Sequence, residues 1–262
     1  MPGSSAPGVI VRLGTVDSTQ SVAFALAERG AADRTVVVAD QQLAGRGRRG
    51  RTWSASAGTS LLASIIVRPR LPQSLLSTLS LTTAVAVAEA LRRVARVDAR
   101  LKWPNDVLVA GRKIAGILLE SRRGGADSDS SARTGSSVVT IVGVGINLGQ
   151  RDFPPDLAAS ATSVALETGR APSRESMLAA LLEEFDAWRA RLESEGFGPV
   201  REAWRRLSDT MGRRVTVDSV TGIAADLDAD GALLIDVGGS IKRVLAGAVS
   251  SGDAVSAPVP AS

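Results

Sequence analysis

A glycine- and arginine-rich segment close behind a strand-like run places the strongest constraint on how this chain can fold. Residues 35–40 (TVVVAD) are rich in β-branched side chains and predict a buried strand. Residues 45–51 (GRGRRGR) then alternate three glycines with four arginines. Glycine lets the backbone approach a ligand closely, and arginine offers a planar fork of donors to carboxylates and phosphates. We interpret the segment as an anion-binding loop at a strand end, where α/β folds place ligand sites.

The glycine spacing of this loop, Gly45-x-Gly47-x-x-Gly50, also matches the dinucleotide-binding fingerprint formally. That fingerprint opens a helix and is followed about 20 residues later by an acidic residue. Here residues 52–59 predict further loop, and the basic residues Arg68 and Arg70 stand where the acid is required. This excludes the dinucleotide interpretation. A solvated basic surface loop stays open as the alternative to an anion site.

The chain contains no cysteine, histidine or tyrosine. This composition excludes disulfides, thiolate nucleophiles, Ser-His catalysis and ordinary zinc sites. An enzyme built from the remaining residues has to use carboxylates, Lys, Arg, Asn, backbone amides or a metal carried by its substrate.

The length of 262 residues predicts one large domain, or one large and one small domain. We expect a cytoplasmic protein, because no apolar run approaches the roughly 18 residues that span a membrane. Residues 1–8 lack the charged and apolar regions of a signal peptide and predict a flexible tail. The formal net charge of +4 is a slight basic excess and only a weak indication of nucleic-acid binding.

Rare residues mark the other candidate site segments. Only three of the 31 basic residues are lysines, Lys102, Lys113 and Lys242, and the only asparagines are Asn105 and Asn147. Where arginine is the default cation, a retained lysine indicates a need for a compact point charge. The clustering of Lys102 and Asn105, with Lys113 close behind, therefore favours a site in this part of the chain.

A predicted hairpin brings these residues together. Trp103-Pro104 predicts a turn after Lys102, strands follow at 107–109 and 113–120, and a tight turn lies between them. We expect Lys102, Asp106 and Lys113 to converge on one end of a sheet, with Gly116 giving a ligand room. A plain Lys–Asp salt bridge is the alternative.

Two further segments carry both structural and functional interpretations. Ser18 and Thr19 either cap a helix that ends near residue 29, or present hydroxyls and free amides to a polar ligand. Gly143 and Gly145 follow an apolar strand at 138–142 and precede Asn147. They either let a ligand pack against the backbone or form a glycine bulge beside a core asparagine.

Periodicity predicts the remaining elements and a domain boundary near residue 209. The segment 122–137 predicts a flexible excursion, and 151–160 predicts a mobile loop. We expect a tail at 1–8, a catalytic domain at 9–208, a small β-barrel at 209–250 and a tail at 251–262. The other expected elements are strands at 9–13 and 61–67, helices at 74–93, 162–168, 174–195 and 199–207, and short strands at 215–217, 222–227, 233–237 and 241–245.

Four segments in fixed order together resemble the signature motifs of biotin protein ligases: GRGRRGRTW at 45–53, KWPND at 102–106, KIAGILLE at 113–120 and GVGIN at 143–147. The resemblance runs from about residue 10 to about residue 250. It implies an α/β (α+β) fold with a central mixed sheet, of the class II aminoacyl-tRNA synthetase and biotin/lipoate ligase type. A small C-terminal β-barrel, similar to a Src homology 3 domain, would follow.

The resemblance also implies a two-step reaction. Biotin and magnesium-ATP would give biotinyl-5′-AMP and pyrophosphate, and biotin would then pass to one lysine of the biotin carboxyl carrier domain of an acyl-CoA carboxylase. The cofactors implied are ATP and Mg²⁺, with biotin as substrate and no direct metal ligand, although Asp106 could help to hold magnesium. We expect no DNA or membrane partner and a monomer or weak homodimer.

Residue roles follow from the same resemblance. The implied catalytic residues are Arg48, Lys102, Asp106 and Lys113, and Asn105 and Asn147 lie on the nucleotide side. Gln20 stands where the family usually has Asn. The loop at 151–160 occupies the place of a segment that orders over adenine. The implied substrate-binding residues are Ser18, Thr19, Gln20, Gln42, Gly45, Arg46, Gly47, Arg48, Arg51, Trp53, Lys113 and Gly116.

Two alternatives belong to other classes of protein. A lipoate or octanoate ligase shares the fold, but the arginine–glycine loop and the KWPND segment argue against it. A nucleic-acid-binding protein or biotin-operon repressor would use Arg46–Arg51 on phosphates. Trp53 is a poor stacking platform by itself, and only about eight residues precede the first predicted strand, so we expect no helix-turn-helix before it.

Overall fold

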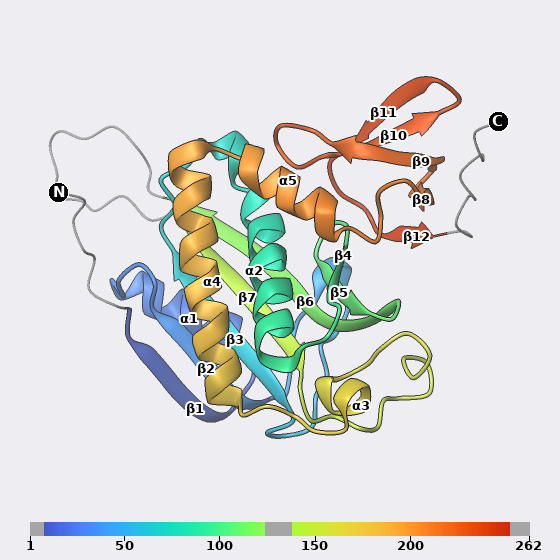
Figure 1. The fold of residues 1–262 in the computed structure, drawn as a ribbon. Helices are drawn as coiled ribbons and strands as arrows, with labels where there is room; N and C mark the ends of the chain where they lie inside the picture. Colours follow the sequence, from blue (N-terminus) through green and yellow to red (C-terminus); the bar gives the residue numbers. More distant parts are fainter. Residues whose placement is uncertain (1–7, 124–137, 252–262) are drawn as a thin grey trace, which may run out of the picture.

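The structure is a computed structural model that describes residues 8–123 and 138–251 (Figure 1). Most of the expected excursion at 122–137 and of the two expected tails therefore lies outside the described residues. Arg122 and Arg123, which begin that excursion, instead extend a long strand.

A seven-stranded mixed sheet forms the centre of the molecule, in the order β1-β2-β3-β7-β6-β5-β4. The pair β1 and β2 is parallel, and every other neighbouring pair is antiparallel. This confirms the mixed sheet that the sequence motifs implied. The strands are β1 (Ile10–Val16), β2 (Val36–Gln42), β3 (Ser60–Val67), β4 (Arg100–Lys102), β5 (Asp106–Val109), β6 (Arg112–Arg123) and β7 (Val138–Asn147).

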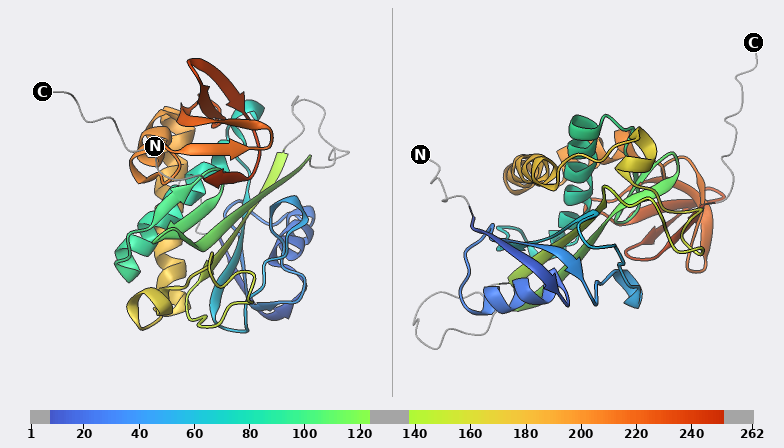
Figure 2. Two further views of the ribbon diagram at one scale, coloured as in Figure 1. Left: turned by 90° about the vertical axis from the view of Figure 1, so that its right-hand side faces the viewer. Right: turned by 90° about the horizontal axis from the view of Figure 1, so that it is seen from below.

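Helices cover both faces of this sheet, which explains the long apolar runs in β2, β3 and β7. The helices α2 (Thr78–Ala95) and α4 (Arg174–Glu195) lie on one face, and α1 (Thr19–Glu28) lies on the other (Figure 2). Odd-numbered residues of β3 belong to the large core under α2 and α4, whereas Ile66 belongs to a smaller core under α1. Because side chains alternate along a strand, both cores use the same strands.

The helix α1 covers only part of its face. Val139 and Ile141 of β7 pack beneath it, but the next residues on that side are Gly143 and Gly145. On β3, the apolar Ile66 under α1 is likewise followed on the same side by a small polar residue, Ser64. The uncovered half of the face therefore carries small and polar residues, and it begins where the N-terminus of α1 lies.

The helix α2 is buried almost all round, as its sequence composition requires. Alanines at 84, 86, 88 and 90 are at most 1% exposed, and their small size allows close packing on every side. This helix begins four residues later than the pattern predicts, after the 3₁₀ turn η2 (Gln73–Leu75). In contrast α4 has the predicted bounds, because Ser173 Oγ accepts the N–H of Ser176 at its start and Gly196 adopts φ 76° at its end.

The chain then forms α3 (Val164–Thr168) before α4, α5 (Gly198–Leu207) after it, and a second sheet. This sheet is antiparallel, in the order β11-β10-β9-β8-β12, and it matches the expected small C-terminal unit. Within residues 138–251, its edges β11 and β12 do not pair, so hydrogen bonds do not close it into a full barrel. The strands are β8 (Arg214–Val217), β9 (Val220–Leu227), β10 (Leu233–Val237), β11 (Ser240–Val244) and β12 (Val249–Ser251).

Trp103 connects the two sheets. Its indole is 2% exposed, and Nε1 donates to the carbonyl of Gly231 in the turn before β10 at 3.1 Å. Its backbone N–H donates to Thr210 Oγ1 at 3.0 Å. These two hydrogen bonds attach the turn within the KWPND segment to the C-terminal unit. Among the described helices, none is long and apolar enough to span a bilayer.

The large core makes one stability prediction. Phe185 of α4 is fully buried in the core under α2 and α4, so Phe185→Ala leaves a cavity and should lower the free energy of unfolding by about 3–5 kcal/mol. Urea denaturation followed by tryptophan fluorescence measures this loss. Leu245→Ala is the control, because Leu245 is 65% exposed and its truncation should cost less than about 1 kcal/mol. Equal losses in the two variants would contradict the assignment of this core.

Candidate active site

Two adjoining cavities occupy the half of the sheet face that α1 leaves uncovered. The inner cavity lies between the N-terminus of α1 and strands β3, β6 and β7. The outer cavity lies beyond it, over β4, β5 and the segment 150–161, and residues 247–249 of the C-terminal unit also line it. The residues common to both cavities form the junction between them: Gly47, Arg48, Trp53, Asn105 and Lys113.

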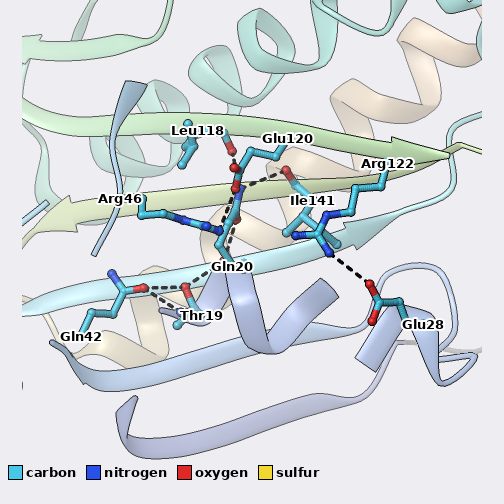
Figure 3. Close-up of polar contacts among 10 residues, drawn as sticks. Thr19, Gln20, Glu28, Gln42, Arg46, Leu118, Glu120, Arg122 and Ile141 are labelled. Carbon is cyan, nitrogen blue, oxygen red and sulfur yellow. Dashed lines mark hydrogen bonds and ion pairs between the residues drawn. The ribbon is translucent and has the colours of Figure 1, made fainter. Parts of the chain in front are cut away.

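Gln42 of β2, rather than Ser18, satisfies the first turn of α1. The Ser18 side chain makes no capping hydrogen bond, although Ser18 is the N-cap residue. Gln42 Oε1 instead accepts the backbone N–H of Thr19 at 2.8 Å and lies 3.0 Å from Thr19 Oγ1 (Figure 3). The capping interpretation of the Ser18 hydroxyl is therefore wrong, and this hydroxyl, which lines the inner cavity, has no capping task.

The glycines of β6 and β7 make room for side chains of the protein itself. A Cβ at Gly145 would lie 2.5 Å from the Trp53 ring, and one at Gly116 would lie 3.0 Å from it. Gly116 and Gly145 pair across the two strands, so the indole rests on a floor without side chains. A Cβ at Gly143 would lie 2.7 Å from Gln20 Oε1. Trp53 and Gln20 therefore lie against these backbones, and the three glycines also line the inner cavity, so the expected close approach of a ligand stays a prediction.

The glycine–arginine loop closes on itself by short backbone contacts. Gly47 N–H donates to the carbonyl of Arg51 at 2.7 Å, and Arg46 pairs with Thr52. Between them, Arg49 and Gly50 adopt φ values of 57° and 73°, the left-handed region in which glycine is the favoured residue.

Two arginines of the glycine–arginine loop form ion pairs outside the junction, although Arg46 lines the inner cavity and Arg49 lines the outer one. Arg46 forms an ion pair with Glu120 of β6 at 3.0 Å, and Arg49 forms one with Asp218 of the C-terminal unit at 2.9 Å. Gly45 does not line either cavity. A Cβ there would lie 2.3 Å from the Trp53 carbonyl, so Gly45 allows the two ends of the loop to touch.

The predicted charged cluster forms at the junction. Lys113 Nζ lies 2.6 Å from Asp106 Oδ1 and 5.5 Å from the centroid of the Trp53 ring. Arg48 Nη1 donates to Asn105 Oδ1 at 3.0 Å, and Asn105 Nδ2 donates to the Ile117 carbonyl at 2.8 Å. Burial lowers the pKa of Arg48, while the nearby Asp106 charge raises it and Arg49 lowers it further. A half-buried guanidinium is poorly screened by water, so its field acts strongly on an anion at the junction.

The outer cavity contains the remaining predicted residues. Lys102 and Arg51 line it, and Lys102 pairs in register with Asp106. Asn147 is 4% exposed and donates through Nδ2 to the Thr162 carbonyl at 3.0 Å. The segment 151–160 reaches the junction because Lys113 N–H donates to the Ser160 carbonyl at 2.8 Å.

The structure therefore brings together most of the predicted site residues, with Gly45 beside rather than within the cavities. Two parts of the lining were not foreseen. Ser64 interrupts the otherwise apolar run of residues 61–67, and that polar interruption is a signal that could have found it. Residues 247–249 carry no such signal, because only the folding of the C-terminal unit brings them to the outer cavity.

The carboxylates at the junction are few. Within 8–123 and 138–251, no group of three or more acidic, histidine or cysteine side chains could hold a metal ion. Asp106 supplies a carboxylate to the outer cavity. The arrangement suits a metal that arrives with phosphates, because Mg²⁺ is commonly held by one or two carboxylates together with substrate phosphates.

Comparisons with known proteins agree with this architecture. Residues 13–132 match the biotin/lipoate A/B protein ligase family, and residues 210–252 match the biotin protein ligase C terminal domain. The chain is 37% identical over 232 residues to the biotin–[acetyl-CoA-carboxylase] ligase of Paracoccus denitrificans, covering 85% of this chain and 92% of that one. It is 33% identical over 243 residues to the bifunctional ligase/repressor BirA of Bacillus subtilis, covering 90% of this chain and 72% of the relative.

Among solved structures, biotin protein ligase from Aquifex aeolicus in complex with biotin and ATP superposes with a TM-score of 0.78 at 29% identity. The superposition covers 93% of this chain and 98% of that one. The signature segments thus meet around two joined cavities in a fold that this chain shares with the Aquifex structure over nearly its full length. On these grounds, the chain belongs to the biotin protein ligase family.

Proposed function

We propose that this chain is an ATP-dependent biotin protein ligase that transfers biotin to a specific lysine of a biotin carboxyl carrier domain of an acyl-CoA carboxylase. The observation that carries the proposal is the junction, where Arg48 and Lys113 stand between a small inner cavity and a larger outer one. The inner cavity suits the ring of biotin and the outer cavity suits ATP. The relative from Paracoccus is named for acetyl-CoA carboxylase, and the Aquifex structure holds biotin and ATP.

In the first step, a carboxylate oxygen of biotin attacks the α-phosphorus of ATP. The bond from that phosphorus to the bridging oxygen breaks, and pyrophosphate leaves with the electron pair. Negative charge concentrates at the junction in this step, where Arg48 and Lys113 provide fixed positive charge. Asp106 positions Lys113 through the 2.6 Å ion pair.

In the second step, the neutral amine of the carrier lysine attacks the acyl carbon of biotinyl-5′-AMP. The bond between that carbon and the phosphate oxygen breaks, AMP leaves and the nitrogen loses a proton. No protein nucleophile is required, which agrees with the absence of cysteine and histidine. The chain has to keep water away from the anhydride, and the loop at 45–53 and the segment 151–160 lie where they can cover it.

Magnesium enters this reaction as the substrate MgATP. Asp106 and the phosphates would hold it, and the metal would neutralise phosphate charge. We assign the nucleotide side to Asn105 and Asn147, and a catalytic role to Lys102. The substrate-binding roles go to Ser18, Thr19, Gln42, Arg46, Gly47, Arg51, Trp53 and Gly116. A cytoplasmic location, action as a monomer or weak homodimer, and no role for DNA are parts of this proposal.

The test of this function is pyrophosphate release from MgATP with biotin, lipoate or octanoate, each with and without a carrier domain. We expect release with biotin alone to stop near one equivalent of enzyme, because the adenylate stays bound, and to continue for many turnovers once the carrier is added. Release with lipoate or octanoate but not with biotin would instead assign the chain to the lipoate or octanoate ligases, which share this fold. No release with any acid would refute ligase chemistry.

Arg48→Gly tests retention of the adenylate. Loss of a charge-assisted contact at the junction should speed escape of biotinyl-5′-AMP by about 10- to 100-fold, so lysines of an added bystander protein become biotinylated. The measurement is streptavidin blotting of albumin in the reaction. Arg70→Gly is the matched control, because Arg70 is exposed and lies in neither cavity. Equal bystander labelling by the two variants would remove Arg48 from this role.

Lys113→Arg tests the point charge at the junction. The planar guanidinium cannot reproduce the geometry of an ammonium 2.6 Å from Asp106, so the rate of the first step should fall by about tenfold or more. Single-turnover pyrophosphate release measures that rate. Lys242→Arg makes the same chemical change at an exposed position of β11 and should leave the rate at the wild-type value. A wild-type rate in Lys113→Arg would mean that Lys113 does not act in this step.

A further inference from the structure

A row of hydrogen-bonded side chains, formed by Gln42, Thr19, Ser64 and Gln20, lines the inner end of the inner cavity. Thr19, Gln20 and Ser64 are at most 4% exposed, and all three line this cavity. Gln42 continues the row on the side of Thr19, and Figure 3 shows Gln20 reaching from α1 to the strands that carry Leu118 and Ile141. Buried polar groups have few partners to choose from, so the direction of each hydrogen bond can be derived from donors and acceptors.

The orientation of the Gln20 amide follows from its neighbours on β6 and β7. Its Nε2 lies 3.3 Å from the Leu118 carbonyl and 3.5 Å from the Ile141 carbonyl, and a carbonyl can only accept. The amide nitrogen must therefore face the strands. Its Oε1 then faces Ser64 Oγ at 3.0 Å, so the Ser64 hydroxyl has to donate to it.

The hydroxyl hydrogen of Thr19 is committed as well. Thr19 Oγ1 lies 2.8 Å from Ser64 Oγ, whose only hydrogen already points to Gln20, and 3.0 Å from Gln42 Oε1, which can only accept. Whichever of these two oxygens receives it, the Thr19 hydrogen points into the protein. Both hydroxyls therefore use their hydrogens within the row and can offer only acceptor lone pairs to the cavity.

Gly143 makes the position of Gln20 possible. A Cβ at residue 143 would lie 2.7 Å from Gln20 Oε1, so any larger residue would displace the amide. The side chain of glutamine, longer than asparagine by one methylene group, gives the amide the reach from the first turn of α1 to β6 and β7. Gln20 and Gly143 are therefore a matched pair, one filling the space that the other leaves.

We propose that Gln20 is a positioning residue that determines specificity: by fixing the direction of the Ser64 hydroxyl, it makes the inner end of the cavity select an acid whose ring presents an N–H donor. The inference rests on the proposed function, since the carboxylate must lie at the junction to meet ATP and the ring must lie at the inner end. The cyclic urea of biotin carries such N–H groups, whereas the ring of lipoate has none.

The test compares biotin with cyclic carbamate analogues, in which one ring N–H at a time is replaced by oxygen. Calorimetry on the full chain gives the ratio of the two dissociation constants, carbamate over urea. We expect this ratio to be about tenfold or more in the wild type for at least one analogue, the effect of one hydrogen bond and its unpaired acceptor. In Gln20→Met the freed Ser64 hydrogen occupies Thr19 Oγ1 or enters the cavity, so the ratio should fall below about threefold.

A second variant keeps the test independent of the folding of Gln20→Met. Ser64→Ala removes one acceptor oxygen from the same row and should also lower the ratio. Ser60→Ala is the matched control on the same strand, because Ser60 is 1% exposed, lines neither cavity and has no hydrogen-bond partner for Oγ among the residues that the structure describes. Its ratio should equal that of the wild type.

A purely structural role for Gln20 would weaken both ligands equally and leave the ratio unchanged, and that outcome would overturn the inference. A wild-type protein that releases pyrophosphate with biotin but shows no preference for the urea over either carbamate would overturn the inference while the proposed function stands. Absence of biotin-dependent release would overturn both.

Discussion

The contact between the Trp53 indole and two paired glycines is the constraint on which the rest of the site depends. Gly116 and Gly145 face each other across β6 and β7, and neither could carry a Cβ at ordinary contact distance from the ring. This contact ties the end of the glycine–arginine loop to the sheet. Because the loop is closed at both ends by Gly45 and Trp53, Arg48 is held at the junction between the two cavities.

The contact also explains why the four signature segments act as a unit although they are far apart in the chain. The loop supplies Arg48, the KWPND turn supplies Asn105 and Asp106, the hairpin strand supplies Lys113, and β7 supplies the glycine floor. Each segment has a partner in another one. A change in one segment therefore alters the geometry of the others, and single substitutions here should not be additive.

A reaction without a protein nucleophile requires the protein to position the reactants, to stabilise charge and to exclude water. Arg48 is half-buried, and the cost of burying it is partly offset by Asn105 and the charge of Asp106. The same desolvation strengthens its attraction for a phosphate or carboxylate. At the opposite end of the inner cavity, neutral hydroxyls and amides replace charges. The inner cavity thus has charged groups at the junction and directed hydrogen bonds at its opposite end.

The C-terminal unit contributes to the lining of the candidate active site. Residues 247–249 line the outer cavity, Arg49 pairs with Asp218, and Trp103 donates to Gly231. These contacts join the second sheet to both the loop and the KWPND turn. Movement of the C-terminal unit would consequently change the shape of the outer cavity.

The sequence by itself determined the family, the mixed α/β architecture and the course of most elements, because these depend on local patterns: the bounds of α4, the run of β3 and the charged hairpin of Asp106 and Lys113 all follow from spacing and capping. Only the tertiary structure decided that Gln42 caps α1, that Gln20 and Trp53 fill the space above the glycines, and that β12 completes the second sheet. These features join residues distant in the chain. Which residues meet depends on which parts of the sheet faces remain uncovered after the helices have packed. Local sequence propensity does not encode that.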